Sequence, residues 1–446
     1  MKKVFVIGAG KSTSYLIKYL LDHSTENDWY ITVGDMDVKN AEIRISNHSK
    51  AKAIYFDVSD TRMREQYISE SDLVISMLPA NLHGQVAKDC LRLCKHLATA
   101  SYVSPEMQNL NEEAKSSGLI FFNEVGLDPG IDHASAMKII DSIHAEGGEI
   151  ETFKSYCGGL VAPESNDNPW GYKFSWNPRN VILAGQGTAQ FLENGELKFI
   201  PYNRIFSQIE KIQIPGLGTF DGYANRDSVS YREPYGLHHV KTLLRGTLRM
   251  NGYCAAWNVF VKLGLTDDSW KLPDWGEISW PQLLKAFLPG IKDFRSELFQ
   301  LGDIIDDKIS QDKFEWLGVF DEKNKINISG KTPAQVLQSL LEKKWLLKAN
   351  DKDMILMQHV FHFRNKENKN QVKKLHSSLV VIGEDQTYTA MAKTVGLPLA
   401  IISKMILQNQ IEKSGVLIPV TADIYEPLLK ELETSQIVFE ENYSVD

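Results

Sequence analysis

The stretch that decides the fold is Lys3-Val4-Phe5-Val6-Ile7-Gly8-Ala9-Gly10, near the amino end of the chain. Its apolar run predicts a short buried strand, and the Gly-x-Gly at its end predicts a tight turn. Residues 13–23 then carry apolar side chains at helical spacing. In a dinucleotide-binding unit, Gly8 permits the turn and Gly10 lets backbone amides approach a pyrophosphate at the start of the helix. We therefore expect a Rossmann unit here.

Two positions near this turn depart from phosphate-binding fingerprints. Thr13 occupies the place of the third glycine, which normally allows close packing of the helix on the strand. Gly10-Lys11-Ser12 resembles the end of an ATP-binding loop, but that loop needs a glycine where Phe5 stands, inside the strand. A dinucleotide is therefore favoured over ATP.

The end of the second expected strand, Val33-Gly34-Asp35-Met36-Asp37, bears on the choice of dinucleotide. An acidic residue at this point can accept both ribose hydroxyls of NAD, and it repels the additional phosphate of NADP. Asp35 is the better placed candidate and Asp37 the second; the alternative is that the aspartate only caps a helix. No arginine lies at this strand end, and Arg44, the nearest, follows a helical turn or more later. The pattern favours NAD over NADP.

The remaining sequence predicts an α/β protein with more than one domain. In the first 126 residues, strand and helix patterns alternate, which is typical of a parallel, doubly wound sheet. The expected strands are 3–8, 29–33, 53–57, 73–77, 96–100 and 120–123, and the expected helices are 13–23, 85–94 and 105–117. The return of strands late in the chain suggests that the central part is inserted into the Rossmann unit.

Beyond residue 130 the pattern changes to that of an α+β domain followed by helices. We expect a helix at 132–144, strands at 150–157, 197–200, 209–212, 354–362 and 377–382, mainly helix between 251 and 347, and helices at 387–395 and 399–407. The predicted domains are a Rossmann domain (1–130 with about 385–446), an α+β substrate and dimerisation domain (131–255 with about 350–384) and a small helical domain (256–349). Trp170, Trp270, Trp275 and Trp280 are expected in the core or at an interface.

Composition excludes several classes of function. The net charge of −8 gives no support for a nucleic-acid partner. The apolar run Val4–Ile7 is too short for a secretory signal, and no uninterrupted apolar segment reaches the ~20 residues of a membrane span. The chain has only 4 cysteines, which suits a reducing cytoplasm. We expect no metal, since Cys90 and Cys94 have no histidine nearby and His359 and His362 would face opposite sides of a strand.

Several longer strings, in matching order, resemble saccharopine dehydrogenases of the glutamate-forming type, also called saccharopine reductases. The resemblance runs nearly end to end. The strings are Ser76-Met77-Leu78-Pro79 with His83, Ser101-Tyr102-Val103-Ser104-Pro105, Asn123-Glu124-Val125-Gly126-Leu127-Asp128-Pro129-Gly130-Ile131-Asp132-His133, Ser155-Tyr156-Cys157-Gly158-Gly159, Gly171-Tyr172-Lys173-Phe174-Ser175-Trp176, Asn225-Arg226-Asp227-Ser228 and Arg245-Gly246-Thr247-Leu248-Arg249.

The resemblance implies a homodimer of Rossmann, α+β and helical domains. It also implies a reaction in which L-glutamate and 2-aminoadipate 6-semialdehyde form an imine that NAD(P)H reduces to saccharopine, and the reverse of that reaction. Fungal proteins that resemble this chain carry a basic residue near the end of the second strand and use NADP, whereas this chain has Met36 there, beside Asp35. NAD is favoured from Asp35, and NADP stays open.

The resemblance also implies roles for individual residues. By analogy, Lys11 and Ser12 join Gly10 at the cofactor phosphates, and Leu78 and Pro79 border the nicotinamide. Further cofactor neighbours would be Thr99, Ala100, Leu127, Asp128 and Trp176. The residues that match substrate positions are Ser101, Tyr102, Asp128, Arg226, Thr247, Leu248 and Arg249.

Saccharopine carries three carboxylates, so a site for it needs cationic side chains within an acidic protein. Arg226, Arg245 and Arg249 are the natural supply, because a guanidinium binds a carboxylate through two hydrogen bonds. The alternative is that each forms a structural ion pair.

Proton transfer also needs side chains, and the shared strings offer Asp128, Tyr102 and Cys157 as catalytic candidates. Asp128 follows a strand between Gly126 and Pro129, where it can orient an ammonium or relay a proton, or simply cap the loop. Cys157 precedes two glycines and can be a small packing residue. The residues identify no general base.

Two other functions stay open at this stage. One is an oxidoreductase that acts on a related adduct such as carboxynorspermidine, which has fewer carboxylates. The other is a dinucleotide-binding sensor without turnover, although a sensor has no use for Arg226 and Arg249 as a carboxylate pocket.

Overall fold

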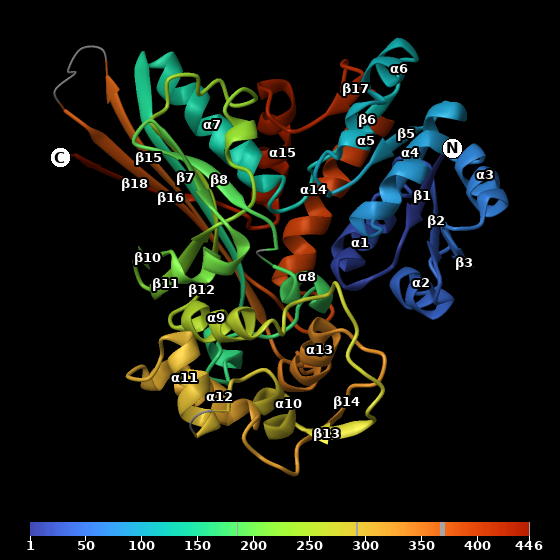
Figure 1. Ribbon diagram of the computed structural model, residues 1–446. Helices are drawn as coiled ribbons and strands as arrows, with labels where there is room; N and C mark the ends of the chain where they lie inside the picture. Colours follow the sequence, from blue (N-terminus) through green and yellow to red (C-terminus); the bar gives the residue numbers. More distant parts are fainter. Residues whose placement is uncertain (185, 291–292, 366–370, 446) are drawn as a thin grey trace. The chain divides into compact units, whose positions relative to one another are not determined.

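The structure of the protein is a computed structural model that describes residues 1–184, 186–290, 293–365 and 371–445 (Figure 1). It divides into two compact units. The first contains residues 1–149 and 379–440, and the second contains residues 150–378 and 441–446. This division places residues 256–349 within the second unit, so their expected separation as a helical domain stays a prediction.

The first unit is built on a seven-stranded sheet in the order β17-β6-β5-β4-β1-β2-β3, with every pair parallel. Its strands are β1 (Lys2–Ile7), β2 (Trp29–Asp35), β3 (Ala51–Tyr55), β4 (Leu73–Ser76), β5 (His96–Ala98), β6 (Ile120–Phe122) and β17 (Gly415–Leu417). The chain order reverses between β1 and β4, and in such sheets ligands bind at the carboxyl ends of the strands beside that point. The α/β Rossmann prediction is confirmed.

Helices flank this sheet. They are η1 (Lys11–Thr13), α1 (Ser14–Asp22), α2 (Val38–Ile45), α3 (Thr61–Ser69), η2 (Ala80–Leu82), α4 (His83–Arg92), α5 (Pro105–Gln108), α6 (Asn111–Ser116), α7 (Ile131–Ala145), α14 (Ala390–Leu407) and α15 (Ala422–Thr434). Short side chains start several of them: Asp37 accepts a hydrogen bond from the Lys39 amide at the start of α2, and Ser104 caps α5.

Helix α14 differs most from the sequence-based expectation. The two helices predicted at 387–395 and 399–407 are one helix that continues through Pro398. Figure 1 shows α14 beside α1, and a Cβ added at Gly396 would lie 2.7 Å from the Leu16 backbone nitrogen. By length and composition α14 meets the criteria for a membrane span, which we did not expect, but 83% of it is buried in the structure, as in a core helix. The free energy gained by burying α14 exceeds the loss of the backbone hydrogen bond that Pro398 cannot donate.

The second unit contains a mixed nine-stranded sheet, with β10-β11-β12-β7-β15-β16-β18 in order, β8 paired with β12, and β9 paired with β8. The strands are β7 (Gly148–Val161), β8 (Ala189–Glu193), β9 (Glu196–Ile200), β10 (Ile209–Ile214), β11 (Gly218–Ala224), β12 (Thr242–Met250), β15 (Asp353–Asn365), β16 (Lys373–Ile382) and β18 (Glu440–Val445). Strand β12 runs parallel to β7 and antiparallel to β11.

The other elements of the second unit are mainly helical. They are η3 (Pro163–Ser165), α8 (Pro178–Ile182), η4 (Tyr202–Ser207), η5 (Val229–Tyr231), α9 (Tyr253–Leu263), α10 (Trp280–Ala286), α11 (Phe294–Gly302), α12 (Lys308–Leu317) and α13 (Pro333–Lys344), with a small sheet of β13 (Glu277–Ser279) and β14 (Lys325–Asn327).

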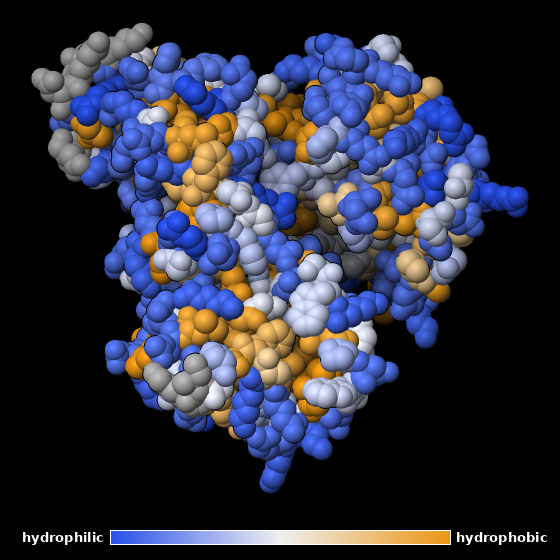
Figure 2. All heavy atoms as spheres, viewed as in Figure 1, coloured by the Kyte–Doolittle hydropathy of each residue, from blue (hydrophilic) through white to orange (hydrophobic). Residues whose placement is uncertain are grey.

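Aromatic side chains fill the core of this unit. Trp170 and Trp280 are buried as expected, and Trp170 packs on Trp257 and Trp345. By contrast, Trp275 is 78% exposed and Trp270 is 44% exposed, so neither lies in the core. The face in Figure 2 is mostly hydrophilic, with separate apolar patches.

Candidate active site

The glycine turn between β1 and η1 leaves room for a phosphate. Gly8 has a φ of +100°, and a Cβ there would lie 3.1 Å from the Met77 carbonyl oxygen, so this position requires glycine. A Cβ at Gly10 would have no heavy atom within 4 Å, because the backbone faces open space. Thr13 is buried, and its hydroxyl donates to the Gly10 carbonyl oxygen at 2.8 Å. The turn therefore fits a dinucleotide without the third glycine.

Asp35, at the end of β2, braces this turn. Its Oδ2 accepts a hydrogen bond from the Ala9 amide at 2.7 Å, and its Oδ1 accepts one from the Asp37 amide at 2.9 Å. Both carboxylate oxygens thus have backbone donors, but the cap of α2 is Asp37, so the helix-capping role weighed against ribose binding falls to Asp37 and not to Asp35. Ribose recognition by Asp35 stays a prediction.

A buried histidine connects the ends of β4 and β5. Nδ1 of His83 lies 2.8 Å from the Ser76 hydroxyl, and Nε2 lies 2.7 Å from the Ser101 hydroxyl and 3.4 Å from that of Thr99. Burial lowers the pKa of His83 to about 4, so the imidazole is neutral at neutral pH. A neutral ring donates through one nitrogen and accepts through the other, so His83 fixes the orientation of the Ser101 hydroxyl. His83 accompanies one of the strings shared with the family, but no role for it followed from the sequence.

Tyr102 and Asp128, both predicted catalytic residues, are brought together in the first unit. The Tyr102 hydroxyl donates to Oδ1 of Asp128 at 3.1 Å. Both side chains are partly exposed, so they are accessible to a ligand.

Glu124 supports the two loops that carry this pair. Its Oε1 accepts a hydrogen bond from the Val103 amide at 3.0 Å, and its Oε2 lies 2.8 Å from Nε2 of His133. Glu124 and His133 are buried, and Glu124 has a φ of +57°. No role for Glu124 or His133 followed from the sequence, and their position inside a shared string was the available signal.

The other predicted residues of the first unit lie at the same carboxyl edge of the sheet. Leu78 and Pro79 follow β4, Ala100 follows β5, and Leu127 is buried in the loop before α7. Lys11 is exposed and Ser12 half-buried in η1, directly after the glycine turn. The structure therefore brings together the cofactor residues that were predicted in this unit.

In the second unit, one face of β12 carries the predicted substrate residues. Side chains alternate along a strand, so Arg245, Thr247 and Arg249 share a face and Leu248 points to the other. Thr247 is opposite Cys157 of β7 on one side and Tyr223 of β11 on the other. Because neighbouring strands place register partners on the same face, Cys157 lies on the arginine face.

Arg249 is buried within a group of tyrosines. Its guanidinium carbon lies 5.4 Å from the ring centre of Tyr172, 5.5 Å from that of Tyr253 and 6.0 Å from that of Tyr223. Its hydrogen bond goes to the Leu248 carbonyl oxygen at 3.0 Å, and no carboxylate pairs with it in the part of the chain that the structure describes. A buried guanidinium with this surrounding is suited to an anionic ligand.

The remaining residues of the second unit are placed around this face. Arg245 is also buried, and its guanidinium carbon lies 4.3 Å from the ring centre of Tyr231. Arg226 is exposed in the loop after β11, with a φ of +44°. Trp176 is half-buried, and its indole nitrogen donates to the Tyr172 hydroxyl at 3.2 Å.

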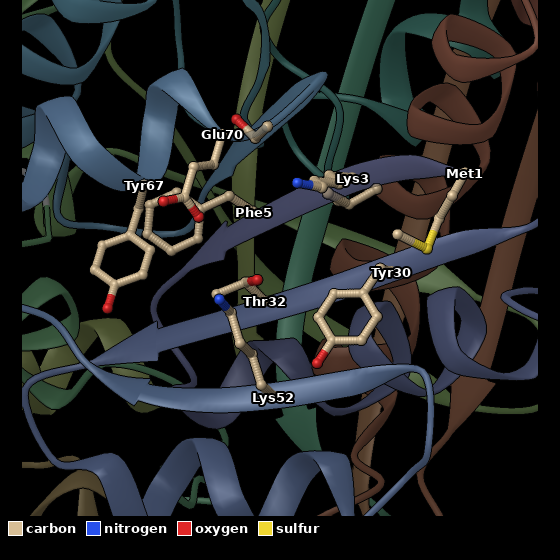
Figure 3. Close-up of a pocket in the computed structure, with 10 residues that line it drawn as sticks. Met1, Lys3, Phe5, Tyr30, Thr32, Lys52, Tyr67 and Glu70 are labelled. Atoms are coloured by element: carbon tan, nitrogen blue, oxygen red, sulfur yellow. The ribbon is translucent and has the colours of Figure 1, made fainter.

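Two further features bear on ligand binding. No group of three or more His, Cys, Asp or Glu side chains among the described residues can hold a metal ion. Figure 3 shows a cavity of about 170 Å³ on the sheet of the first unit, lined by Phe5, Tyr30, Lys52 and Tyr67 among others. It lies toward the amino ends of β1 and β2 and contains none of the predicted site residues.

Comparison with known proteins covers both units. Residues 4–122 match the family model of the saccharopine dehydrogenase NADP binding domain, and residues 126–437 match that of the saccharopine dehydrogenase C-terminal domain. The preference for NAD that we predicted from Asp35 is therefore not supported, because the matching domain family binds NADP. The Asp35 carboxylate accepts hydrogen bonds from backbone amides of the turn, a role that an acidic residue at this strand end can have without binding the ribose.

Individual relatives agree with this assignment. The chain is 35% identical to the NADP⁺-dependent, L-glutamate-forming saccharopine dehydrogenase of Pyricularia oryzae, over 97% of this chain and 96% of the relative. It is 37% identical to the mitochondrial alpha-aminoadipic semialdehyde synthase of Mus musculus, of which it spans 47%. The solved structure of apo saccharopine dehydrogenase (L-Glu forming) from Saccharomyces cerevisiae superposes with a TM-score of 0.88 at 32% identity, and the match covers 100% of both chains. The chain belongs to the saccharopine dehydrogenase family of oxidoreductases.

Proposed function

We propose that this protein catalyses the NADP-dependent interconversion of saccharopine with L-glutamate and 2-aminoadipate 6-semialdehyde. The observation that carries the proposal is Arg249, a buried guanidinium without a carboxylate partner among the described residues, on the same strand face as Cys157. A cation in that condition calls for an anionic substrate, and saccharopine has three carboxylates.

The first unit supplies the cofactor residues. Bound NADP⁺ would accept a hydride from the carbon that joins the secondary nitrogen to the aminoadipate side of saccharopine, because that carbon becomes the aldehyde. Gly10 leaves the approach to the start of η1 and α1 open, so that backbone amides can bind the pyrophosphate. Leu78 and Pro79 lie at the end of β4, where the topology of the sheet reverses and a nicotinamide would bind.

The second unit supplies the cations. Arg249 and Arg245 project from one face of β12, and Arg226 is exposed in the loop that precedes η5. A guanidinium binds a carboxylate through two parallel hydrogen bonds, which orients a substrate as well as holding it. We assign Arg249 to a carboxylate of saccharopine because its guanidinium contacts tyrosine rings and one carbonyl oxygen but no carboxylate among the described residues.

Proton transfer is assigned to Tyr102 and Asp128. Oxidation removes a hydride and a proton from the secondary amine and leaves an imine; water then adds to the imine carbon, and the C–N bond breaks to release glutamate and the aldehyde. The Asp128 carboxylate, which accepts the Tyr102 hydrogen bond at 3.1 Å, can take the amine proton and return it to the departing nitrogen. His83 positions Ser101 through the 2.7 Å contact and does not itself titrate near neutral pH.

Initial rates with purified protein test the proposal. With saccharopine and NADP⁺, we expect the absorbance of reduced nicotinamide to grow, and to grow much more slowly with NAD⁺. Carboxynorspermidine serves as the competing substrate, because it lacks part of the carboxylate set. Turnover of carboxynorspermidine in preference to saccharopine would contradict the substrate assignment, and binding of NADP⁺ and saccharopine without any turnover would favour the sensor.

The family resemblance leads us to propose a cytoplasmic homodimer as well. Leu197 and Phe199 on β9 are 50% and 59% exposed, and such side chains are commonly covered by a partner. Light scattering of the purified protein is expected to give twice the mass of 50.5 kDa, and a monomer at micromolar concentration would overturn this part of the proposal.

A further inference from the structure

Arg44 lies where the sequence spacing did not lead us to expect a cation. It is in the last turn of α2, and its Nη2 donates to the carbonyl oxygen of Gly10, 34 residues earlier, at 3.4 Å. The fold therefore returns a guanidinium to the glycine turn, although no arginine follows β2 directly. Met36 and Asp37, which do follow it, are exposed and supply no cation.

The guanidinium of Arg44 has no carboxylate partner in the described residues, and the 3.4 Å contact with Gly10 is a weak hydrogen bond. The side chain is half-buried, which lowers the pKa of Arg44, while the nearby Tyr388 phenol opposes that change. Arginine nevertheless stays charged in proteins. The turn thus has a half-buried cation whose donors are mostly unused, which is the condition of a site that receives an anion.

The acidic residue nearby does not neutralise this cation. The two oxygens of Asp35 accept hydrogen bonds from the Ala9 and Asp37 amides, and Oδ1 is also 3.5 Å from Nδ2 of Asn40. The Asp35 carboxylate therefore binds backbone amides of the turn and not the Arg44 guanidinium. An anion at the turn would meet Arg44 and a carboxylate whose charge is shared among three donors.

Thr387 and Tyr388, from the carboxy-terminal segment of the first unit, contact the start of α1. The Ser14 hydroxyl, in the first turn of α1, donates to the Thr387 carbonyl oxygen at 2.7 Å. The ring of Tyr388 packs edge-on against Tyr15 at 5.3 Å between ring centres. These contacts fix Tyr388, whose phenol acts electrostatically on the Arg44 guanidinium.

We propose that Arg44 binds the 2′-phosphate of NADP and is the residue through which this chain selects NADP over NAD. In a Rossmann unit the adenosine ribose lies between the end of the second strand and the glycine turn, and the Arg44 guanidinium reaches that turn at Gly10. A phosphomonoester there can accept two hydrogen bonds from a guanidinium, whereas NAD has only a hydroxyl at the same position. This inference rests on the proposed NADP-dependent function.

Binding measurements without turnover test this inference. NADPH and NADH are titrated into the full-length protein by calorimetry, with the fragments 2′,5′-ADP and 5′-AMP as further ligands. The variants are Arg44→Met, Arg44→Lys, and Lys115→Met, which removes an exposed positive charge from α6 in the same unit. Arg44→Met is expected to weaken NADPH and 2′,5′-ADP binding by about 10- to 100-fold, the value of one or two hydrogen bonds to a charged group.

We expect NADH and 5′-AMP to bind Arg44→Met as they bind the wild type, Arg44→Lys to lose less affinity for NADPH, and Lys115→Met to lose none. Equal losses of NADPH and NADH affinity would show that Arg44 only holds Gly10, and no loss would show that another group binds the phosphate; either result overturns the inference. A wild-type protein that binds NADH but not NADPH overturns the proposed function itself, so the two failures are distinguishable.

Discussion

Arg249 is a cation held away from water and surrounded by tyrosine rings. Burying a guanidinium costs free energy, and ring faces recover only part of that cost. Arg64, by contrast, is also buried but binds Asp89 at 2.7 Å, as a structural arginine does. Arg64 thus has an acidic partner within the protein, whereas we propose that the partner of Arg249 is a carboxylate of the substrate.

Replacing Arg249 tests this distinction. In Arg249→Met, we expect the KM for saccharopine to rise by about 10- to 100-fold, because one bidentate hydrogen bond to a carboxylate is lost. The Kd for NADPH should stay unchanged, since the cofactor residues of the first unit are intact. Arg249→Lys keeps the charge but not the forked geometry, and should fall between wild type and Arg249→Met. Equal effects on saccharopine and NADPH would indicate a structural role.

His83 makes a prediction about stability and pH. Its pKa is about 4 in the folded protein, against 6.5 in the unfolded chain, because burial disfavours the imidazolium. Its stabilising contribution is therefore complete above pH 6.5 and is lost as the pH falls toward 4, by on the order of 3 kcal/mol. Urea unfolding of wild type and His83→Gln between pH 7 and 4.5 measures the difference.

The free-energy difference between these two proteins should shrink as the pH falls, since the glutamine does not titrate. Parallel pH profiles would contradict a neutral, buried His83. The same variant should lower kcat with saccharopine and leave NADPH affinity intact, as expected of a residue that positions Ser101.

Single residues were predicted unevenly from the sequence. The glycine turn was predicted from its Gly-x-Gly motif, and Tyr102 and Asp128 each stand in a string shared with the family. The structure shows the open turn and the hydrogen bond between Tyr102 and Asp128. Asp35 and Arg44 depend on which way a side chain turns: Asp35 bonds to Ala9, and Arg44 returns to Gly10. Neither contact follows from spacing, and the NAD preference was corrected by the match to the NADP binding domain family.

At the scale of elements, β12 positions the arginines of the second unit, and α14 packs on α1, which follows the glycine turn. Alternation along β12 directs its two arginines to the face that also holds Cys157. Gly158, the next residue of β7, could not carry a Cβ, because that atom would lie 2.7 Å from the Leu248 carbonyl oxygen. Helix α14 similarly approaches α1 through Gly396, and α1 begins at the cofactor turn. Close packing of these elements therefore fixes the position of functional backbone.

Two glycines allow this packing to be separated from binding. Gly396→Ala places a Cβ against backbone, and we expect the free energy of unfolding to fall by about 1–3 kcal/mol. Gly10→Ala meets no neighbour, so its unfolding free energy should match the wild type while its affinity for NADPH drops. Urea unfolding and calorimetric titration of both variants provide the check. Loss of stability in Gly10→Ala, without loss of affinity, would contradict the role of the open turn.

Elements with a clear period were predicted well. The first six strands of the Rossmann sheet and helix α7 match their expected positions closely, because a buried parallel strand is a short apolar run. Strand β17 was missed, since its three residues pair only with β6 and carry no pattern of their own. The break between α5 and α6 and the continuity of α14 through Pro398 depend on tertiary packing, which local preference does not report.

At the scale of the whole molecule, the chain passes from the first unit to the second at residue 150, returns at 379 and enters the second unit again at 441. The first unit therefore gains α14 and α15 from the far end of the sequence. Each unit contains its own set of predicted residues: hydride and proton transfer in the first, carboxylate binding in the second. A Rossmann unit alone is compatible with many reactions, so the cations of the second unit carry the assignment to saccharopine.

The most direct test of this account is to identify the products formed from saccharopine and NADP⁺ by mass spectrometry. We expect L-glutamate and 2-aminoadipate 6-semialdehyde, each in an amount equal to the NADPH produced. Release of lysine and 2-oxoglutarate would mean that the other C–N bond breaks and would contradict it, as would a reaction that runs on NAD⁺ and not on NADP⁺.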